Sequence, residues 1–300
     1  MKLILLSDVH LTSKNPRSRT DNVLVTGFKK LSYIFNYALN NNINYILQSG
    51  DLFNGPRDIF ALFKFLSLKN KYKNINFLTI YGQHCLYSRN KNVPTNLGIL
   101  SKSSIIEILN NRNPYVIDNK IKIYGCGWRD KAPKIKDGNI LVIHAPITTK
   151  ALWSKHKFNK AKHFLKENNN YDLILCGDIH RYFLINKNNR IICNTGPMLR
   201  LEATEYNFTH KPKFFIYDTE SKKTEEKTIP HQNANDILES GHIDISNEEN
   251  SIGDLYLNID KIDRDEINIL TIIDELIKQS NKEESIRNII ELLNEKVNNE

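Results

Sequence analysis

Short apolar runs recur along the first two-thirds of the chain, and turn-forming or polar residues follow each run. Runs of this length and composition are typical of β-strands. We expect strands at residues 3–6, 45–47, 77–80, 121–124, 140–143, 173–175, 191–193 and 214–217. Apolar residues spaced three and four apart predict amphipathic helices over residues 23–39 and 59–68. Strand and helix therefore alternate in the first part of the chain.

The strands expected between residues 115 and 217 are closer together along the chain, with fewer helical patterns between them. This spacing predicts a second, largely antiparallel sheet that packs on the first. After Asp218 the composition shifts to Glu, Asp and Asn, and residues 221–227 are expected to form an exposed connection. We therefore expect a folded domain over residues 1–218 and an acidic segment over 219–300, which ends in two amphipathic helices.

The charge of the chain is divided between these two parts. Residues 1–218 contain 33 Lys and Arg against 14 Asp and Glu, whereas residues 219–300 contain 9 against 20. A strongly positive domain attracts polyanions, which favours nucleic acid as the molecule it meets. A solvated lysine-rich surface explains the same charge equally well.

The four cysteines have neither the spacing of a zinc site nor that of a disulfide framework. This pattern predicts a reducing, cytoplasmic environment. No run of about 18 apolar residues is present, so we expect no membrane association.

Polar motifs follow five of the expected strands: Asp8-Val9-His10, Gly50-Asp51, Gly82-Gln83-His84, His144 and Gly177-Asp178-Ile179-His180. Strands that end at a common sheet edge bring such residues together. Three aspartates, four histidines and one glutamine can hold two hard or borderline divalent cations. Any one of these residues alone is more often a turn, cap or hydrogen-bonded structural residue. Their repetition at five strand ends favours a dinuclear metal site.

In these motifs the chain resembles the calcineurin-like metallophosphoesterases and, among them, the SbcD-type DNA repair nucleases, which include phage recombination nuclease subunits. The family pattern D-x-H, G-D, G-N-H-D, an isolated His and G-H-x-H occurs in order, and the match covers roughly residues 1–200. The resemblance implies a four-layer α/β fold of two sheets flanked by helices, with a small helical or α+β appendage at the C-terminus. Because the SbcD-type group includes phage proteins, the resemblance is compatible with a phage-encoded protein inside a host cell.

The resemblance further implies a role for each motif residue. It divides the expected ligands between two ions: Asp8, His10, Asp51 and His180 around one, and Asp51, Gln83, His144 and Asp178 around the other. Asp51 would bridge the ions, and His84 would stabilise or protonate the leaving oxygen. The implied activity is that of a DNA exonuclease or endonuclease that uses a two-metal mechanism, with Mn²⁺ as the usual ion and Mg²⁺ as the alternative.

Three positions depart from the family pattern. Gln83 replaces Asn and Asp178 replaces His, and both keep a donor atom. The anionic oxygen of Asp178 favours harder ions such as Mn²⁺ or Mg²⁺. Cys85 replaces an Asp, so His84 lacks a carboxylate beside it in the sequence.

Four arginines fall in or near the loops expected around the metals: Arg17, Arg19, Arg181 and Arg200. A guanidinium in such a loop can hold a DNA phosphate, although a solvated surface role is equally compatible with the sequence.

SbcD-type nucleases carry a capping domain and a helical element that docks on the coiled coil of an SbcC-type ATPase. The acidic segment at 219–300 is therefore expected to bind such a partner, with packing on its own domain as the alternative. The sequence is also compatible with a homodimer. Two other functions also stay open: hydrolysis of small phosphodiesters or phosphoproteins, and a catalytically impaired scaffold that binds DNA and a partner.

Overall fold

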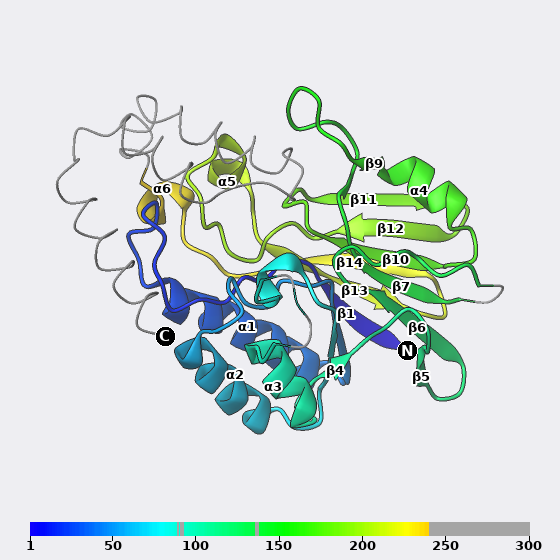
Figure 1. Cartoon of the computed structure of the whole chain (residues 1–300), viewed down its shortest axis with the longest axis horizontal. Coiled ribbons are helices and arrows are strands. Elements are labelled where there is room, and N and C mark those ends of the chain that lie inside the picture. Colours follow the sequence, from blue (N-terminus) through cyan, green and yellow to red (C-terminus); the bar gives the residue numbers. More distant parts are fainter. Residues whose placement is uncertain (89, 91–92, 136–137, 240–300) are drawn as a thin grey trace, which may run out of the picture. The chain divides into compact units, whose positions relative to one another are not determined.

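The computed structural model describes residues 1–88, 90, 93–135 and 138–239 (Figure 1). In this part of the chain, two six-stranded sheets pack on one another and helices cover their outer faces. This arrangement confirms the predicted four-layer α/β fold. The two helices expected near the C-terminus lie outside the described residues.

The first sheet has the strand order β14-β13-β1-β2-β3-β4. Its strands are β1 (Lys2–Leu6), β2 (Tyr45–Gln48), β3 (Asn76–Thr79), β4 (Glu107–Ile108), β13 (Lys213–Asp218) and β14 (Lys223–Thr228). The strands from β1 to β4 are parallel, and β13 is antiparallel to both β1 and β14. Its outer face carries α1 (Val23–Asn40) and α2 (Ile59–Lys71), with α3 (Asn96–Lys102) beside them.

The second sheet has the order β11-β12-β10-β7-β6-β5. Its strands are β5 (Tyr115–Ile117), β6 (Ile121–Cys126), β7 (Ile140–His144), β10 (Leu173–Gly177), β11 (Phe183–Lys187) and β12 (Arg190–Asn194). The helix α4 (Ala161–Glu167) packs on its outer face. Smaller elements are η1 (Gln83–Cys85), β8 (Ile147–Thr148), β9 (Asn159–Lys160), α5 (Glu205–Thr209) and α6 (Ala234–Ile237).

All eight expected strands and both helices of the first part are present, but three expectations about their arrangement are wrong. The second sheet is mostly parallel, because β6, β7, β10 and β12 run in the same direction and only the two edge strands are antiparallel. The strand expected at 214–217 belongs to the first sheet, where it pairs with β1. The expected connection at 221–227 is largely the exposed edge strand β14.

The central strands of both sheets are buried on two faces. In β1, Leu3 and Leu5 lie in the core between the sheets, whereas Ile4 and Leu6 lie in the core beneath the helices. This alternation explains why the strand is a continuous apolar run rather than an alternating one. Burial of each such side chain contributes roughly 1.5–3 kcal/mol.

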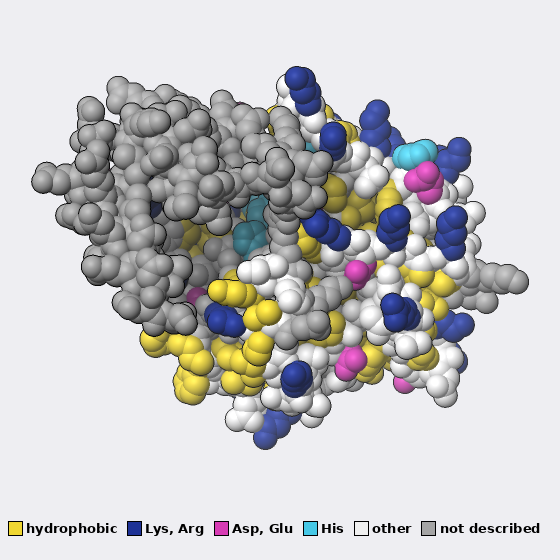
Figure 2. Space-filling model, viewed as in Figure 1, with side chains coloured by type: hydrophobic (Ala, Val, Ile, Leu, Met, Phe, Trp, Pro, Cys, Tyr) yellow, Lys and Arg dark blue, Asp and Glu magenta, His cyan; other side chains and the backbone are white. Residues whose placement is uncertain are grey.

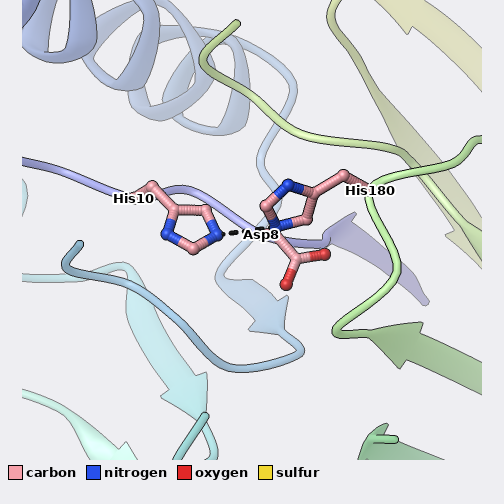
Figure 3. A group of neighbouring side chains, drawn as sticks. All are labelled: Asp8, His10 and His180. Carbon is pink, nitrogen blue, oxygen red and sulfur yellow. Dashed lines mark hydrogen bonds between the residues drawn. The ribbon is translucent and has the colours of Figure 1, made fainter. Parts of the chain in front are cut away.

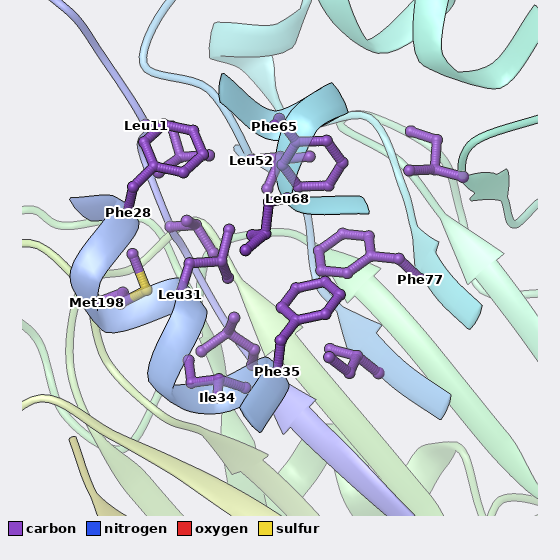
Figure 4. Close-up of a cluster of buried hydrophobic side chains, with 14 of the residues drawn as sticks. Leu11, Phe28, Leu31, Ile34, Phe35, Leu52, Phe65, Leu68, Phe77 and Met198 are labelled. Atoms are coloured by element: carbon purple, nitrogen blue, oxygen red, sulfur yellow. The ribbon is translucent and has the colours of Figure 1, made fainter. Parts of the chain in front are cut away.

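The helices α1 and α2 are held on the first sheet by aromatic and aliphatic packing (Figure 4). Phe77 of β3 lies between the helices: its ring centroid is 6.0 Å from that of Phe35 in α1 and 5.4 Å from that of Phe65 in α2. Each helix begins at a side-chain cap. Asn22 accepts a hydrogen bond from the backbone N–H of Val25, and Asp58 accepts one from Ala61. No helix among the described residues is both long enough and apolar enough to cross a membrane.

Candidate metal centre

The parallel strands β1, β2 and β3 of one sheet and β7 and β10 of the other end where the polar motifs begin. The backbone joins two of these motifs directly. Val9 and His10 donate hydrogen bonds to the carbonyl oxygen of Asp51, at 3.2 and 2.9 Å. His10, Asp51 and Asp178 adopt φ angles of 54°, 53° and 91°. Such left-handed backbone is uncommon for non-glycine residues and costs free energy that the surrounding contacts must offset.

Asp8, His10 and His180 form the first group of side chains that could hold a metal (Figure 3). The Nε2 atoms of His10 and His180 lie 2.9 Å apart. His10 Nδ1 lies 3.1 Å from Asn54 Oδ1. Because an amide oxygen only accepts, we assign the proton of His10 to Nδ1, which leaves the Nε2 lone pair for a metal.

Asp8, Asp51 and His144 form a second group. His144 Nδ1 donates to the carbonyl oxygen of Ser49 at 2.7 Å, which directs Nε2 towards the other ligands. Three side-chain oxygens surround this Nε2: Gln83 Oε1 at 2.8 Å, Asp51 Oδ2 at 3.2 Å and Asp178 Oδ1 at 3.8 Å. The backbone N–H of Asp178 also donates to Asp8 Oδ1 at 3.0 Å, so the two groups are joined.

His10, Asp51 and His84 form a third group. The backbone N–H of His84 donates to Asp51 Oδ1 at 2.9 Å, and His84 Nδ1 lies 3.2 Å from the carbonyl oxygen of Asn54. The ring of His84 meets that of His10 edge to face, with the centroids 5.0 Å apart. His84 is therefore held beside the ligands through its backbone and through Nδ1, and its Nε2 is not used by these contacts.

Glycine is required where the motif loops touch the ligands. A Cβ added at Gly82 would lie 2.1 Å from Asp51 Oδ1, and one at Gly50 would lie 2.5 Å from His144 Nδ1. Gly50 also has a φ of 91°, which favours glycine. These close approaches explain why a glycine precedes the polar residues in both motifs.

The family model for calcineurin-like phosphoesterases matches residues 1–182. The chain belongs to the calcineurin-like phosphoesterase family. No curated protein matches the chain.

Solved structures resemble the chain at low sequence identity. An archaeal phosphodiesterase is 17% identical over 76% of this chain and 100% of its own, with a TM-score of 0.42. A putative 5'-nucleotidase from Staphylococcus aureus is 12% identical with a TM-score of 0.48; the match covers 77% of this chain but only 55% of the nucleotidase. A Vps29 variant from Entamoeba histolytica is 10% identical over 77% of this chain and 100% of its own, with a TM-score of 0.36. The activities in these names are properties of those proteins.

The donor set of this calcineurin-like phosphoesterase fits divalent cations. The carboxylate oxygen Asp8 Oδ2 is buried and has no hydrogen-bond partner among the described residues, and the buried Asp51 Oδ2 has only His144 Nε2 beside it, at 3.2 Å. A buried anionic oxygen is costly unless a cation or proton compensates it. Imidazole nitrogens bind such ions at about 2.0–2.1 Å, so the Nε2 atoms of His10 and His180 could occupy neighbouring positions around one ion.

Burial and charge perturb the buried ligands in different directions. Burial raises the pKa of Asp8, and the nearby His180 and His144 offset this only in part. Burial would also raise the pKa of Asp51, but His144 holds it well below its usual range. Burial would lower the pKa of His144, yet the charges of Asp51, Asp8 and Asp178 raise it to about 10. His144 therefore carries a proton at neutral pH in the protein alone, and a cation that binds its Nε2 must displace that proton.

The structure thus brings together all seven expected ligands and His84, and their division between two ions stays a prediction. Asn54 was not predicted, although it contacts two of the histidines. The sequence signal for it was its position three residues after Asp51, in the same loop. Cys85 is buried, which raises the pKa of its thiol to about 12, so it is neutral and cannot replace the missing carboxylate.

The four arginines have different surroundings. Arg19 is buried, pairs with Asp21 at 2.7 Å and donates to the carbonyl oxygen of Arg200. Arg200 is also buried and donates to the carbonyl oxygen of Gln232. The prediction that these two hold DNA phosphates is therefore not supported, because their guanidinium groups are enclosed by the protein. Arg17 is exposed, and the half-buried Arg181 lies over the ring of Tyr206 at 4.0 Å.

A small cavity of about 90 Å³ opens beside the centre. His10, His84 and His180 line one part of it, and Asn54 lies with them. These three histidines therefore face the open space beside the centre. The arrangement is that of a metal-dependent phosphoesterase.

Proposed function

We propose that this protein is the nuclease subunit of an SbcD-type complex. It would hydrolyse DNA phosphodiester bonds with the help of two divalent ions, and Mn²⁺ is the ion that we expect. The observation that supports this most directly is the phosphoesterase-type cluster of Asp and His residues within a strongly basic part of the chain. In the part of Figure 2 that is not grey, Lys and Arg side chains are spread over the face in view and acidic side chains are fewer. A surface of this kind attracts a polyanion through its phosphates.

The size of the cavity favours a substrate that extends beyond it. Pockets that enclose drug-sized ligands measure about 300–1,000 Å³, whereas the cavity at the three histidines measures about 90 Å³. Leu199, Leu201 and Glu202 also line this cavity, and it is too small to enclose a whole nucleotide or peptide. The rest of the substrate would then lie on the basic surface, as a nucleic-acid strand does.

The chain would hold the two ions with the residues of the first and second groups together with Gln83 and Asp178. When bound, such ions neutralise the phosphoryl oxygens and lower the pKa of water at the site. The protein supplies the proton transfer. His84 Nδ1 is occupied by the carbonyl oxygen of Asn54, so a proton on Nε2 is the one that His84 can give to the leaving oxygen. Asp51 has a different role, because it contacts His84 and His144 and belongs to two of the metal groups.

The test is DNA cleavage by the purified full chain with Mn²⁺, on labelled duplex and single-stranded DNA, beside Asp51→Ala and His84→Ala. We expect Asp51→Ala to lose bound metal and turnover together. His84→Ala should keep its metal and turn over about 10²- to 10⁴-fold more slowly. Equal background cleavage by wild type and both variants would remove the nuclease proposal, and loss of metal from His84→Ala would contradict the division of roles.

The same experiment separates the alternatives. Turnover of a small phosphodiester or a phosphoprotein with no cleavage of DNA would indicate the broader phosphoesterase function. DNA binding without turnover on any of these substrates would indicate the scaffold, an alternative favoured by the neutral, buried Cys85 beside His84.

We also propose that the chain binds an SbcC-type ATPase partner and that it forms a homodimer. The helical patterns expected to bind the ATPase fall within residues 240–300, outside the described residues. Size-exclusion chromatography with light scattering of the full chain, alone and with a coiled-coil ATPase partner, tests both proposals.

A further inference from the structure

The loop between β8 and β9 carries a stack of aromatic rings at the surface. Trp153 is 59% exposed. Its ring lies 4.0 Å from that of His156, with the planes inclined by 31°, and the ring of His156 lies 4.9 Å from that of Phe158, inclined by 23°. Because His156 covers one face of the indole, much of the exposed area of Trp153 belongs to the other face.

The stack is held in place by the loop itself. The backbone N–H of Leu152 donates to His156 Nδ1 at 3.3 Å, and the backbone N–H of His156 donates to the carbonyl oxygen of Trp153 at 3.3 Å. The ends of the loop are joined where β8 and β9 pair. The exposed indole face is therefore ordered before any ligand arrives, which reduces the entropic cost of binding.

The charged residues of the loop that carries this stack are all lysines. Residues 150–166 contain six lysines, and residues 138–166 contain no Asp or Glu. Lys150, Lys155 and Lys157 belong to the loop and are exposed. A protein partner that buried Trp153 would have to desolvate or neutralise these lysines, whereas a nucleic-acid strand carries the complementary charge at each phosphate.

The position of the loop fits such a role. It follows β7, whose last residue is the expected ligand His144, so it leaves the second sheet at the edge that carries the metal centre. In Figure 1 the loop that leads into β9 projects beyond the strands at the top of the view.

We propose that this loop binds single-stranded nucleic acid, with an unpaired base stacked on the free face of Trp153 and neighbouring phosphates held by Lys150, Lys155 and Lys157. Aromatic side chains stack on any base, so the site would be tolerant of sequence but selective for unpaired bases. A base inside a duplex has no free face to offer. The inference rests on the proposed nuclease function and deepens it, because it names the form of substrate that the protein would bind.

The experiment measures binding without metal, in EDTA, so that it does not depend on cleavage. The chain has two tryptophans, Trp128 and Trp153, and Trp128→Phe leaves Trp153 as the only indole. In that background we expect oligo(dT) to quench the fluorescence. Trp153→Ala in the otherwise unchanged chain should weaken oligo(dT) binding by about 5- to 100-fold, while Trp153→Phe should retain most of it. Binding of blunt duplex DNA should change much less.

The lysines are tested by salt dependence. Each phosphate contact on a single strand contributes about 0.7 to the slope of log affinity against log salt. Replacement of Lys150, Lys155 and Lys157 by Gln should lower this slope by about 2, whereas Trp153→Ala should leave it nearly unchanged. A thermal melt of each variant checks that it is folded, which we expect because these side chains are exposed.

Three results would overturn the inference: absence of quenching by oligo(dT), equal loss of duplex and single-strand binding in Trp153→Ala, or quenching that depends on protein concentration without DNA. The last result would indicate contact between copies of the chain. The outcome is separate from that of the nuclease proposal. If the protein binds oligo(dT) in EDTA but cleaves no DNA in Mn²⁺, the nuclease proposal is contradicted and the inference about the loop stands. If Trp153→Ala cleaves and binds DNA as wild type does, the inference is contradicted and the nuclease proposal stands.

Discussion

His10 Nε2 and His180 Nε2 face one another at 2.9 Å inside the metal centre, with Asp8 beside them. Two imidazole lone pairs at this distance repel unless a proton or a cation lies between them. Burial and the charge of His180 hold the pKa of His10 well below its usual range. The site is therefore built to be completed by a positive ion, and the folded protein should gain stability when that ion binds.

The first prediction follows from this pair. At a free Mn²⁺ concentration about 100 times the dissociation constant, binding stabilises the folded state by about 2.7 kcal/mol, which is a rise in Tm of about 5–10 °C for a domain of this size. His180→Ala should remove most of that rise. His163→Ala is the matched control, because the side chain of His163 is 68% exposed on α4 and pairs only with Glu167 in the described structure. Thermal melts in EDTA and in Mn²⁺ measure both, and an equal rise in the two variants would contradict the prediction.

The second prediction concerns Asn54, which positions two histidines through different atoms. Its side-chain Oδ1 contacts His10 Nδ1, and its backbone carbonyl contacts His84 Nδ1. Asn54→Ala removes only the first contact, so we expect metal affinity to fall by about 10- to 100-fold. Asn54→Asp keeps an acceptor oxygen and should bind metal more tightly than Asn54→Ala does. Titration with Mn²⁺ followed by calorimetry makes the comparison, and equal affinity of Asn54→Ala and wild type would show that the side chain does not position His10.

The third prediction uses two glycines that differ in their surroundings. A Cβ at Gly82 would meet Asp51 Oδ1 at 2.1 Å and the Asp51 backbone nitrogen at 2.6 Å, whereas a Cβ at Gly55 would meet nothing within 4 Å. Gly82→Ala must therefore displace Asp51. We expect it to lose metal binding and to destabilise the domain by roughly 1–3 kcal/mol. Gly55→Ala should bind metal normally and change stability by less than about 1 kcal/mol. Denaturant unfolding and metal analysis of the pair provide the measurement.

The fourth prediction concerns metal preference. Asp178 Oδ1 lies 3.8 Å from His144 Nε2, at the position where the family pattern has a histidine. A carboxylate oxygen favours harder ions and an imidazole nitrogen favours borderline ones. Asp178→His should shift the preference from Mn²⁺ or Mg²⁺ towards Zn²⁺ or Ni²⁺. Competition between Mn²⁺ and Zn²⁺ for the purified protein would show it, and an unchanged ratio would mean that Asp178 is not a ligand.

The fifth prediction is a pH dependence of stability that arises at His210. This side chain is buried, donates from Nε2 to the carbonyl oxygen of Pro197 at 2.9 Å and contacts the hydroxyl of Tyr206 through Nδ1. Burial lowers its pKa from 6.5 to about 4. The unfolded chain takes up this proton first as the pH falls, so stability is present above pH 6.5 and is lost between about pH 6.5 and 4.

The expected loss at His210 is on the order of 3 kcal/mol. His210→Gln should be less stable than wild type at pH 7 and should lose less stability on acidification. His163→Gln is the exposed control and should follow the wild-type curve. Urea unfolding in Mn²⁺-free buffer at several pH values tests this, and parallel curves for His210→Gln and wild type would exclude His210 as the cause.

Much of the site could be predicted from the sequence because its signals are local. A continuous apolar run such as Leu3–Leu6 indicates a strand that is buried on both faces. The Asp-x-His motif that follows it indicates which metal-binding side chains lie at the end of that strand. The same reasoning applies at Asp51, His144 and Asp178. Since parallel strands end at one edge of a sheet, strand ends and donor types were enough to predict that these side chains meet.

Other features depend on contacts between distant parts of the chain, which leave little trace in local periodicity. The strand β13 pairs with β1 across more than 200 residues of sequence, and β10 pairs with β7 through a crossover that includes α4, so neither sheet membership nor the parallel direction followed from spacing. The burial of Arg19 against Arg200 likewise joins segments about 180 residues apart. Asn54 acquires its role only when the loop after β2 meets His10 and His84. The sequence by itself determined which residues could bind a metal and where the strands lie; the tertiary structure decided which of them touch, because hydrogen-bond partners and burial are set by chain segments that local patterns do not record.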